Sequence, residues 1–170
     1  VLPQKPWKLD LPEIILLLGM GAAFSQYANM LVGMLQSVLN YQEYQESMDQ
    51  LMEGKQMWFL ILSMGIIAPL AEEIVFRWLI YLRLRDYMRM GAAAVISGLI
   101  FGIYHGNLVQ AVYASLLGIV FAYILDISGC LWSSVLLHME ANIWSLISPD
   151  LYTWIIARNP AAIMILFLIL

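Results

Sequence analysis

Two adjacent carboxylates stand inside a long apolar run, in the stretch EEIVFR that begins at Glu72. Apolar sequence continues on both sides, through Met57–Pro69 and Trp78–Leu82. Charged groups at bilayer depth are costly, so they need partners and mark candidate functional sites. Glu73 and Arg77 are four residues apart, and in a helix we expect them to form an ion pair. Glu72 is rotated by about 100° from Glu73 on a helix, so we expect it to face another helix or a water-filled cavity.

The only two histidines, His105 and His138, also fall within apolar segments. Asn142 follows His138 by four residues, so the two side chains share one helix face. Gly98 and Gly102 share a face with His105, which predicts a close approach by a neighbouring helix. A carboxylate, two imidazoles and a carboxamide could together form a general base and an oxyanion site. The competing interpretation is that each group is a hydrogen-bonded packing residue.

The composition requires a membrane environment. Of the 170 residues, 62% are hydrophobic and 12% are charged, whereas a soluble domain is about half apolar and a quarter charged. We therefore expect a polytopic membrane protein. The net charge of −4 offers no basic patch, so nucleic acid is not expected as a partner.

The apolar runs predict an all-α transmembrane helix bundle with about six spans. We expect spans over residues 13–39, 57–82, 91–106, 108–125 and 130–147, with a sixth beginning at 160–170. Residues 40–55 form an acidic aqueous loop with a possible amphipathic turn, and residues 148–159 are polar and interfacial. Pro69 should deprive the Gly65 carbonyl of its helical partner and kink the second span.

Positive charge predicts the orientation of these spans. Arg83, Arg85 and Arg89 follow the second span, which indicates that its end is cytoplasmic. The N-terminal lysines then lie inside and the acidic 40–55 loop lies outside. At 1.5 Å per residue from the cytoplasmic ends, Glu72 and His138 are roughly 15 and 12 Å deep, whereas His105 is roughly 21 Å deep.

Three motifs carry a resemblance to a known family: Glu72-Glu73-x-x-x-Arg77, Phe101-x-x-x-His105 and His138-x-x-x-Asn142. Their order and spacing resemble those of the CAAX-protease and bacteriocin-processing (CPBP, or Abi) family of intramembrane endopeptidases. The resemblance covers about residues 57–170, which we interpret as the protease domain. The family has about eight helices, so we expect this domain to be truncated at its C-terminus. Residues 1–56 then form an interfacial segment, the first span and an acidic extracytoplasmic loop.

The resemblance implies a multi-pass enzyme of the cell membrane, with a water-accessible cavity open towards the cytosol. Its substrate would be a peptide or a lipidated protein, bound among membrane lipids and without a cofactor. In the family pattern Glu72 resembles the general base that activates water, and His105 helps to hold that water. His138 and Asn142 resemble the oxyanion-stabilising pair. The supporting residues are three: Glu73, Arg77 and Phe101.

Two other functions are compatible with the same residues. Glu72, His105 and His138 could instead be the ligands of a zinc ion in a metalloprotease, with water in the fourth position. The chain could also be a non-catalytic membrane protein that confers bacteriocin immunity by sequestering a partner. No residue in the sequence distinguishes a prenylated protein from a leader or signalling peptide as the substrate.

Overall fold

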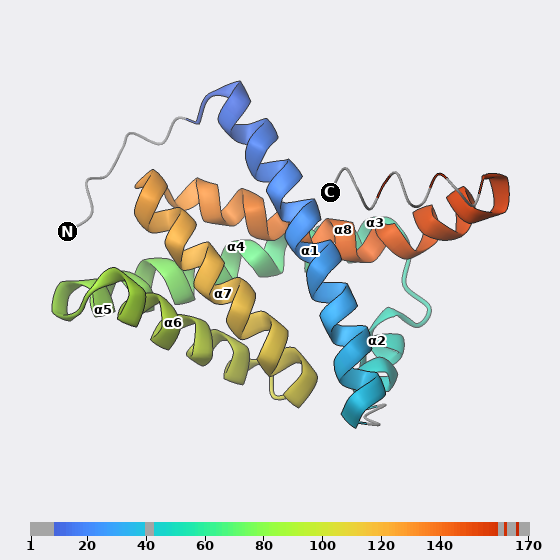
Figure 1. The fold of residues 1–170 in the computed structure, drawn as a ribbon, viewed down its shortest axis with the longest axis horizontal. Coiled ribbons are helices and arrows are strands. Elements are labelled where there is room, and N and C mark those ends of the chain that lie inside the picture. The colour runs from blue at the N-terminus through green and yellow to red at the C-terminus, as the bar shows by residue number, and fades with distance from the viewer. Residues whose placement is uncertain (1–8, 40–42, 160–161, 163–165, 167–170) are drawn as a thin grey trace.

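Helices account for every regular element in the part of the chain that the computed structural model describes, which is residues 9–39, 43–159, 162 and 166. The predicted all-α class is therefore confirmed. The elements are α1 (Leu11–Leu39), α2 (Glu43–Met52), a continuous helix from Met57 to Tyr87, α6 (Met90–Tyr104), α7 (Leu108–Ser128) and α8 (Leu131–Arg158) (Figure 1). The continuous helix, which we call helix 57–87, contains the segments α3 (Met57–Leu60), α4 (Ala68–Glu73) and α5 (Leu82–Tyr87).

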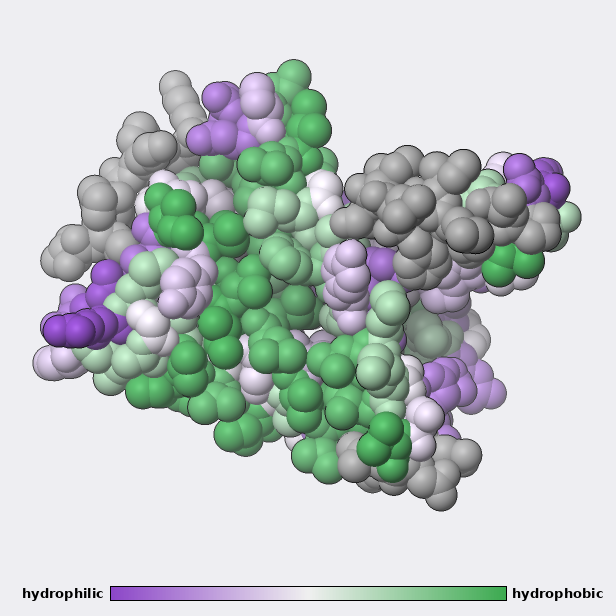
Figure 2. Space-filling view, viewed as in Figure 1, coloured by the Kyte–Doolittle hydropathy of each residue, from purple (hydrophilic) through white to green (hydrophobic). Residues whose placement is uncertain are grey.

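Among the described residues, three helices are long and apolar enough to cross a membrane: residues 11–38 of α1, helix 57–87 and α7. The shorter helix α6 is also apolar, and the predicted fifth span lies within α8. Figure 2 shows apolar residues over most of the face in view, with hydrophilic residues gathered at its margins. The predicted sixth span falls almost entirely outside the described residues.

Polar side chains determine where several helices begin and end. At the start of α1, the Asp10 N–H donates to the Glu13 carboxylate (3.1 Å), and the Glu13 N–H donates to the Asp10 carboxylate (2.9 Å). This reciprocal pair satisfies two N–H groups that a helix start leaves free. The Asn107 side chain accepts from the Gln110 N–H at the start of α7. Gly129, at φ 65°, ends α7 in the left-handed conformation that suits glycine.

Two predicted segments are more helical than we expected. Residues 43–52 of the acidic segment form a complete helix, α2, instead of a single amphipathic turn. Residues 148–158, which we predicted as a polar interfacial segment, continue α8 even though Pro149 lies within them. The helix is longer than the predicted span because the end of an apolar run marks a change of solvent, whereas backbone hydrogen bonding can continue beyond it.

Helix 57–87 accommodates Pro69 by widening. Two π-helical segments, η1 (Ile61–Ile67) and η2 (Ile74–Tyr81), flank α4. The N–H of Ala68 bonds to the carbonyl of Ser63, five residues earlier. Such π turns are rare and occur frequently at functional sites. We predicted a kink at Pro69. At this proline the structure shows a change of hydrogen-bond register within a continuous helix.

Helices α6 and α7 pack with almost no space between their backbones. A Cβ atom built on Gly102 would lie 2.1 Å from Ser115 Oγ and 2.3 Å from the Ala111 carbonyl oxygen. A Cβ on Gly98 would lie 2.7 Å from the Ser115 carbonyl oxygen. The glycine face of α6 is thus the close helix contact that the sequence predicted.

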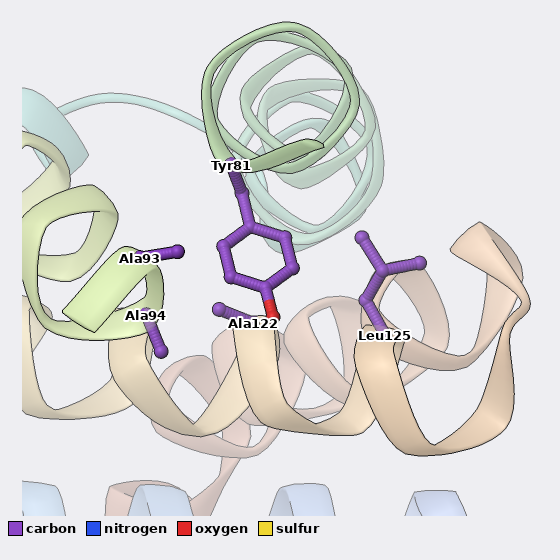
Figure 3. Packing of buried hydrophobic residues seen from close by; sticks show 5 residues of the cluster. All are labelled: Tyr81, Ala93, Ala94, Ala122 and Leu125. Atoms are coloured by element: carbon purple, nitrogen blue, oxygen red, sulfur yellow. The ribbon is translucent and has the colours of Figure 1, made fainter. Parts of the chain in front are cut away.

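A second cluster joins helix 57–87 to α6 and α7. Tyr81 is fully buried and points between Ala93 and Ala94 of α6 and Ala122 and Leu125 of α7 (Figure 3). Its hydroxyl continues past this apolar cluster and donates to the Asp126 carboxylate at 2.9 Å. Arg85 Nε donates to the same carboxylate oxygen at 2.8 Å. These contacts tie the end of helix 57–87 to the end of α7.

We expect Gly102→Ala to destabilise the protein by about 1–3 kcal/mol, because the added methyl group forces α6 and α7 apart. The matched control is Gly19→Ala on α1, where a Cβ meets nothing within 4 Å. Reversible unfolding of both variants in detergent micelles measures the difference. Equal stability of the two variants would contradict the close α6–α7 contact.

Candidate active site

A cavity of about 200 Å³ brings together the four side chains that we predicted as catalytic. Glu72 comes from α4, His105 from the end of α6, and His138 and Asn142 from α8. Residues from α2 and α7 complete the wall. Residues up to 70 positions apart in the sequence therefore face one common space, which is the arrangement that shared chemistry requires.

The π-helical turn before Glu72 explains how Asn142 is held. Because Ala68 bonds five residues back, the corresponding partner of the Met64 carbonyl would be Pro69, which has no N–H. The Asn142 Nδ2 donates to this Met64 carbonyl at 2.9 Å. From an α-helical register we predicted that Pro69 leaves the Gly65 carbonyl without a helical partner. In the π-helical register, the carbonyl that Pro69 leaves without a partner is that of Met64. One N–H of the Asn142 amide is used in this bond, and the second remains for the cavity.

A buried polar network joins Arg77, Glu73 and His138. Glu73 Oε2 lies 3.1 Å from Arg77 Nε, and both side chains have no exposed surface. The predicted ion pair is therefore confirmed. The other carboxylate oxygen, Oε1, lies 2.9 Å from His138 Nδ1. Sequence reasoning missed this second contact, because it joins two helices that are 65 residues apart. Glu73 thus orients His138 as well as neutralising Arg77.

The proton positions on His138 follow from this geometry. An ionised carboxylate can only accept, so the bond to Glu73 places a proton on His138 Nδ1. The opposite ring nitrogen, Nε2, then lies 3.6 Å from Glu72 Oε2. The Glu72 side chain is 20% exposed, whereas that of Glu73 is fully buried. The two adjacent carboxylates are therefore divided between the cavity and the protein interior, as their helix positions predicted.

His105 lies at the end of α6 and presents one nitrogen to the cavity. Its Nδ1 is 2.9 Å from the Phe101 carbonyl oxygen, which can only accept, so Nδ1 carries a proton. In the neutral ring Nε2 is then unprotonated and can accept a hydrogen bond from water. The next residue, Gly106, adopts φ 71° and turns the chain towards α7. His105 lines the cavity, while Gly98 and Gly102 form the helix contact.

Phe101 is the packing residue at the centre of these groups. Its ring lies 4.9 Å from the His105 ring and 5.6 Å from the His138 ring, edge to face in both cases. The Arg77 guanidinium stands over the Phe101 ring, 4.5 Å from its centroid. A cation over an aromatic face is stabilised by the ring quadrupole. Phe101 therefore separates the buried cation from the two histidines and limits how both rings can rotate.

The zinc alternative needs three ligands around one point. Within residues 9–39, 43–159, 162 and 166, no three His, Cys, Asp or Glu side chains are arranged to hold a metal ion. Because Nδ1 of His138 bonds to Glu73 and Nδ1 of His105 bonds to a backbone carbonyl, each ring could offer only Nε2 to a metal ion, and these two nitrogens and Glu72 are not gathered around one point. The residues do not fit a zinc site in this geometry, so we derive no step through zinc. That the protein needs no cofactor stays a prediction, with zinc as the alternative.

Sequence reasoning missed the contribution of α2 and α7 to the cavity. Tyr44, Met48 and Leu51 of α2 line it, together with Gln110 and Tyr113 of α7. The Tyr44 and Tyr113 hydroxyls are 3.3 Å apart, and their rings meet edge to face. Burial raises the pKa of the Tyr44 hydroxyl, which therefore stays protonated. The apolar periodicity of residues 44–51 could have indicated an amphipathic helix, but not what it covers.

The position of α2 bears on two of our predictions. Residues 40–55 were predicted outside, while the cavity was predicted to open to the cytosol. Because α2 lines the cavity, the two predictions agree only if the cavity opens on the side away from α2. The same arrangement explains the depth of His105. It lies at the end of α6 remote from the arginine-rich turn, so its distance from the cytoplasmic end is large.

Comparison with known proteins gives two matches. The family described as "Type II CAAX prenyl endopeptidase Rce1-like" matches residues 54–144, just over half of the chain. A Bacillus subtilis (strain 168) protein named "Putative membrane peptidase YdiL" is 30% identical over 83 residues, which is 49% of this chain and 34% of that protein. The chain thus spans about a third of the length of the curated relative it matches. No solved structure matches.

We expect Glu73→Gln to destabilise the fold by about 3–5 kcal/mol, because it leaves the Arg77 guanidinium as an unpaired buried charge. The matched control is Glu72→Gln at the adjacent position, which faces the cavity and should leave stability close to that of the wild type. Thermal unfolding of both purified variants provides the comparison. A Glu73→Gln protein as stable as Glu72→Gln would disprove the structural role of the buried pair.

Labelling from outside the cell decides the orientation of the cavity. Single cysteines are introduced by Glu46→Cys in α2 and Tyr87→Cys at the end of α5, both exposed positions, after Cys130→Ser. The arginines near position 87 predict that this position is cytoplasmic. An impermeant maleimide added to intact cells should therefore label the Glu46→Cys protein and not the Tyr87→Cys protein. The reverse pattern would keep the cytosolic opening and place the arginines outside.

Proposed function

The chain belongs to the Rce1-like family of type II CAAX prenyl endopeptidases, and from this premise we propose that it is a membrane-embedded endopeptidase. The observation that carries the proposal is the convergence of Glu72, His105, His138 and Asn142 on one cavity. A membrane peptidase among its relatives supports the same reaction class. The proposed substrate is a membrane-associated or lipidated peptide or protein.

In the proposed reaction Glu72 is the general base. Its carboxylate takes a proton from a water molecule whose other contact is the lone pair of His105 Nε2. The resulting hydroxide attacks the carbonyl carbon of the scissile peptide bond and forms a tetrahedral oxyanion. Glu72 then gives the proton to the departing amine nitrogen, so that the products are a carboxylic acid and an amine. No oxidant, reductant or cofactor enters this balance.

His138 and Asn142 are the proposed donors to the oxyanion. Asn142 offers the amide N–H that the Met64 carbonyl does not use. His138 already donates from Nδ1 to Glu73, so it can donate from Nε2 only as an imidazolium. Carboxylates face both of its ring nitrogens and stabilise that charge. With Arg77 and both glutamates ionised, the imidazolium also makes the cluster electrically neutral.

We expect Glu72→Ala to abolish cleavage, because no other carboxylate among the described residues lines the cavity. We expect Asn142→Ala to lower kcat by about 100- to 1,000-fold, the usual effect of removing one oxyanion donor. Both are measured with purified protein in lipid vesicles, on a pool of palmitoylated and prenylated peptides analysed by mass spectrometry. The melting temperature of Glu72→Ala should match that of the wild type.

The same assay tests the alternatives. Cleavage that persists in Glu72→Ala would overturn the proposed mechanism. Loss of activity in a chelator, with recovery on adding zinc, would favour the metalloprotease. A bacteriocin-immunity phenotype that survives both Glu72→Ala and His105→Ala would instead favour the non-catalytic binder.

A further inference from the structure

Helix α2 lies outside the family-matched residues and yet forms part of the cavity wall. The match covers residues 54–144, whereas α2 spans Glu43–Met52. Tyr44, Met48 and Leu51 of α2 line the same cavity as Glu72. Their spacings of four and three residues place them on one helix face. The chain therefore adds to the catalytic cavity a surface that the family motifs do not specify.

The two faces of α2 differ in chemistry. Towards the cavity it presents one tyrosine and two apolar side chains. Glu46 and Asp49 are exposed, and on a helical wheel they lie on the side of α2 opposite Tyr44 and Leu51. Leu51 remains 49% exposed although it lines the cavity. The apolar side of α2 is thus turned towards the cavity and is not closed off by the surrounding helices.

A contact at its first turn holds α2 in place over the cavity. The Tyr44 hydroxyl lies 3.3 Å from that of Tyr113, and the two rings meet edge to face at a centroid distance of 6.1 Å. Tyr113 belongs to α7, whose Phe121 stacks on the catalytic His138 at 4.6 Å. The inner face of α2 is thus connected to the helix that supports the reacting groups.

We propose that the inner face of α2 determines specificity by contacting an apolar substrate side chain next to the scissile bond. This inference rests on the proposed peptidase function. The proposed donors to the scissile carbonyl come from α8, and the groups that hold the attacking water come from α4 and the end of α6, while the described side chains that α2 contributes are Tyr44, Met48 and Leu51. Both sets of side chains line one cavity of about 200 Å³, so a substrate side chain next to the scissile bond would lie close to the α2 wall. Met48 and Leu51 therefore select for apolar side chains.

A charge introduced on the wall tests the proposal. Met48→Lys should raise the ratio of kcat/KM for peptides with an acidic residue beside the cleaved bond, relative to apolar ones, by at least tenfold. The control Glu46→Gln changes the net charge by the same single unit on the outer face of α2, and should leave the ratio unchanged. The substrates are a pool of palmitoylated decapeptides of random sequence, with cleavage sites read by mass spectrometry. An unchanged ratio in Met48→Lys, or an equal change in both variants, overturns the proposal.

A second readout does not depend on turnover. In a Glu72→Gln, Cys130→Ser protein, the thiol introduced by Met48→Cys should become at least fivefold slower to react with maleimide when the apolar peptides of the pool are added. The thiol introduced by Glu46→Cys should react at the same rate with and without peptide. If added peptide does not protect the thiol at position 48, the proposed contact between α2 and the substrate is wrong, even where the wild type cleaves the peptides. If Glu72→Ala still cleaves while position 48 is protected, the proposed mechanism fails and the wall stands.

Discussion

A single buried carboxylate, that of Glu73, connects the two halves of the candidate site. One of its oxygens neutralises Arg77 and the other holds His138, so that the charge of one helix orients a side chain of another. Arg77 in turn donates to the Gly118 carbonyl of α7 at 3.2 Å and stands over the Phe101 ring of α6. Because an unpaired charge inside the bundle would be very costly, these four helices can pack only in an arrangement that completes the network.

The backbone of helix 57–87 contributes as much as its side chains. The π-helical register before Pro69 leaves the Met64 carbonyl without a helical partner, and Asn142 satisfies it. A proline that would weaken an ordinary helix thereby becomes a docking point for α8. The result is that both proposed oxyanion donors are held by contacts to helix 57–87, which also carries Glu72. Rigid placement of this kind is what electrostatic stabilisation of a transition state requires.

The cavity combines a family-matched core with a wall from outside the match. Residues 54–144 supply the polar groups on helices that are tightly packed through glycine and alanine. Helix α2 adds aromatic and apolar side chains from the segment before it. Under the proposed function, chemistry and selectivity fall to different parts of the chain, and α2 makes none of the contacts of the buried Glu73–Arg77 pair.

The sequence by itself determined the helical class, the residues of the site and the Glu73–Arg77 pair, because apolar runs and four-residue spacings are local properties of a helix. It did not determine that Glu73 also holds His138, that Met64 supplies the acceptor for Asn142, or that α2 lines the cavity. Those contacts join residues 65 or more positions apart, or depend on a π-helical register that no local pattern specifies. Only the packing of the helices decided them. A polar group buried in an apolar interior needs a hydrogen-bond partner, and here that partner comes from another helix.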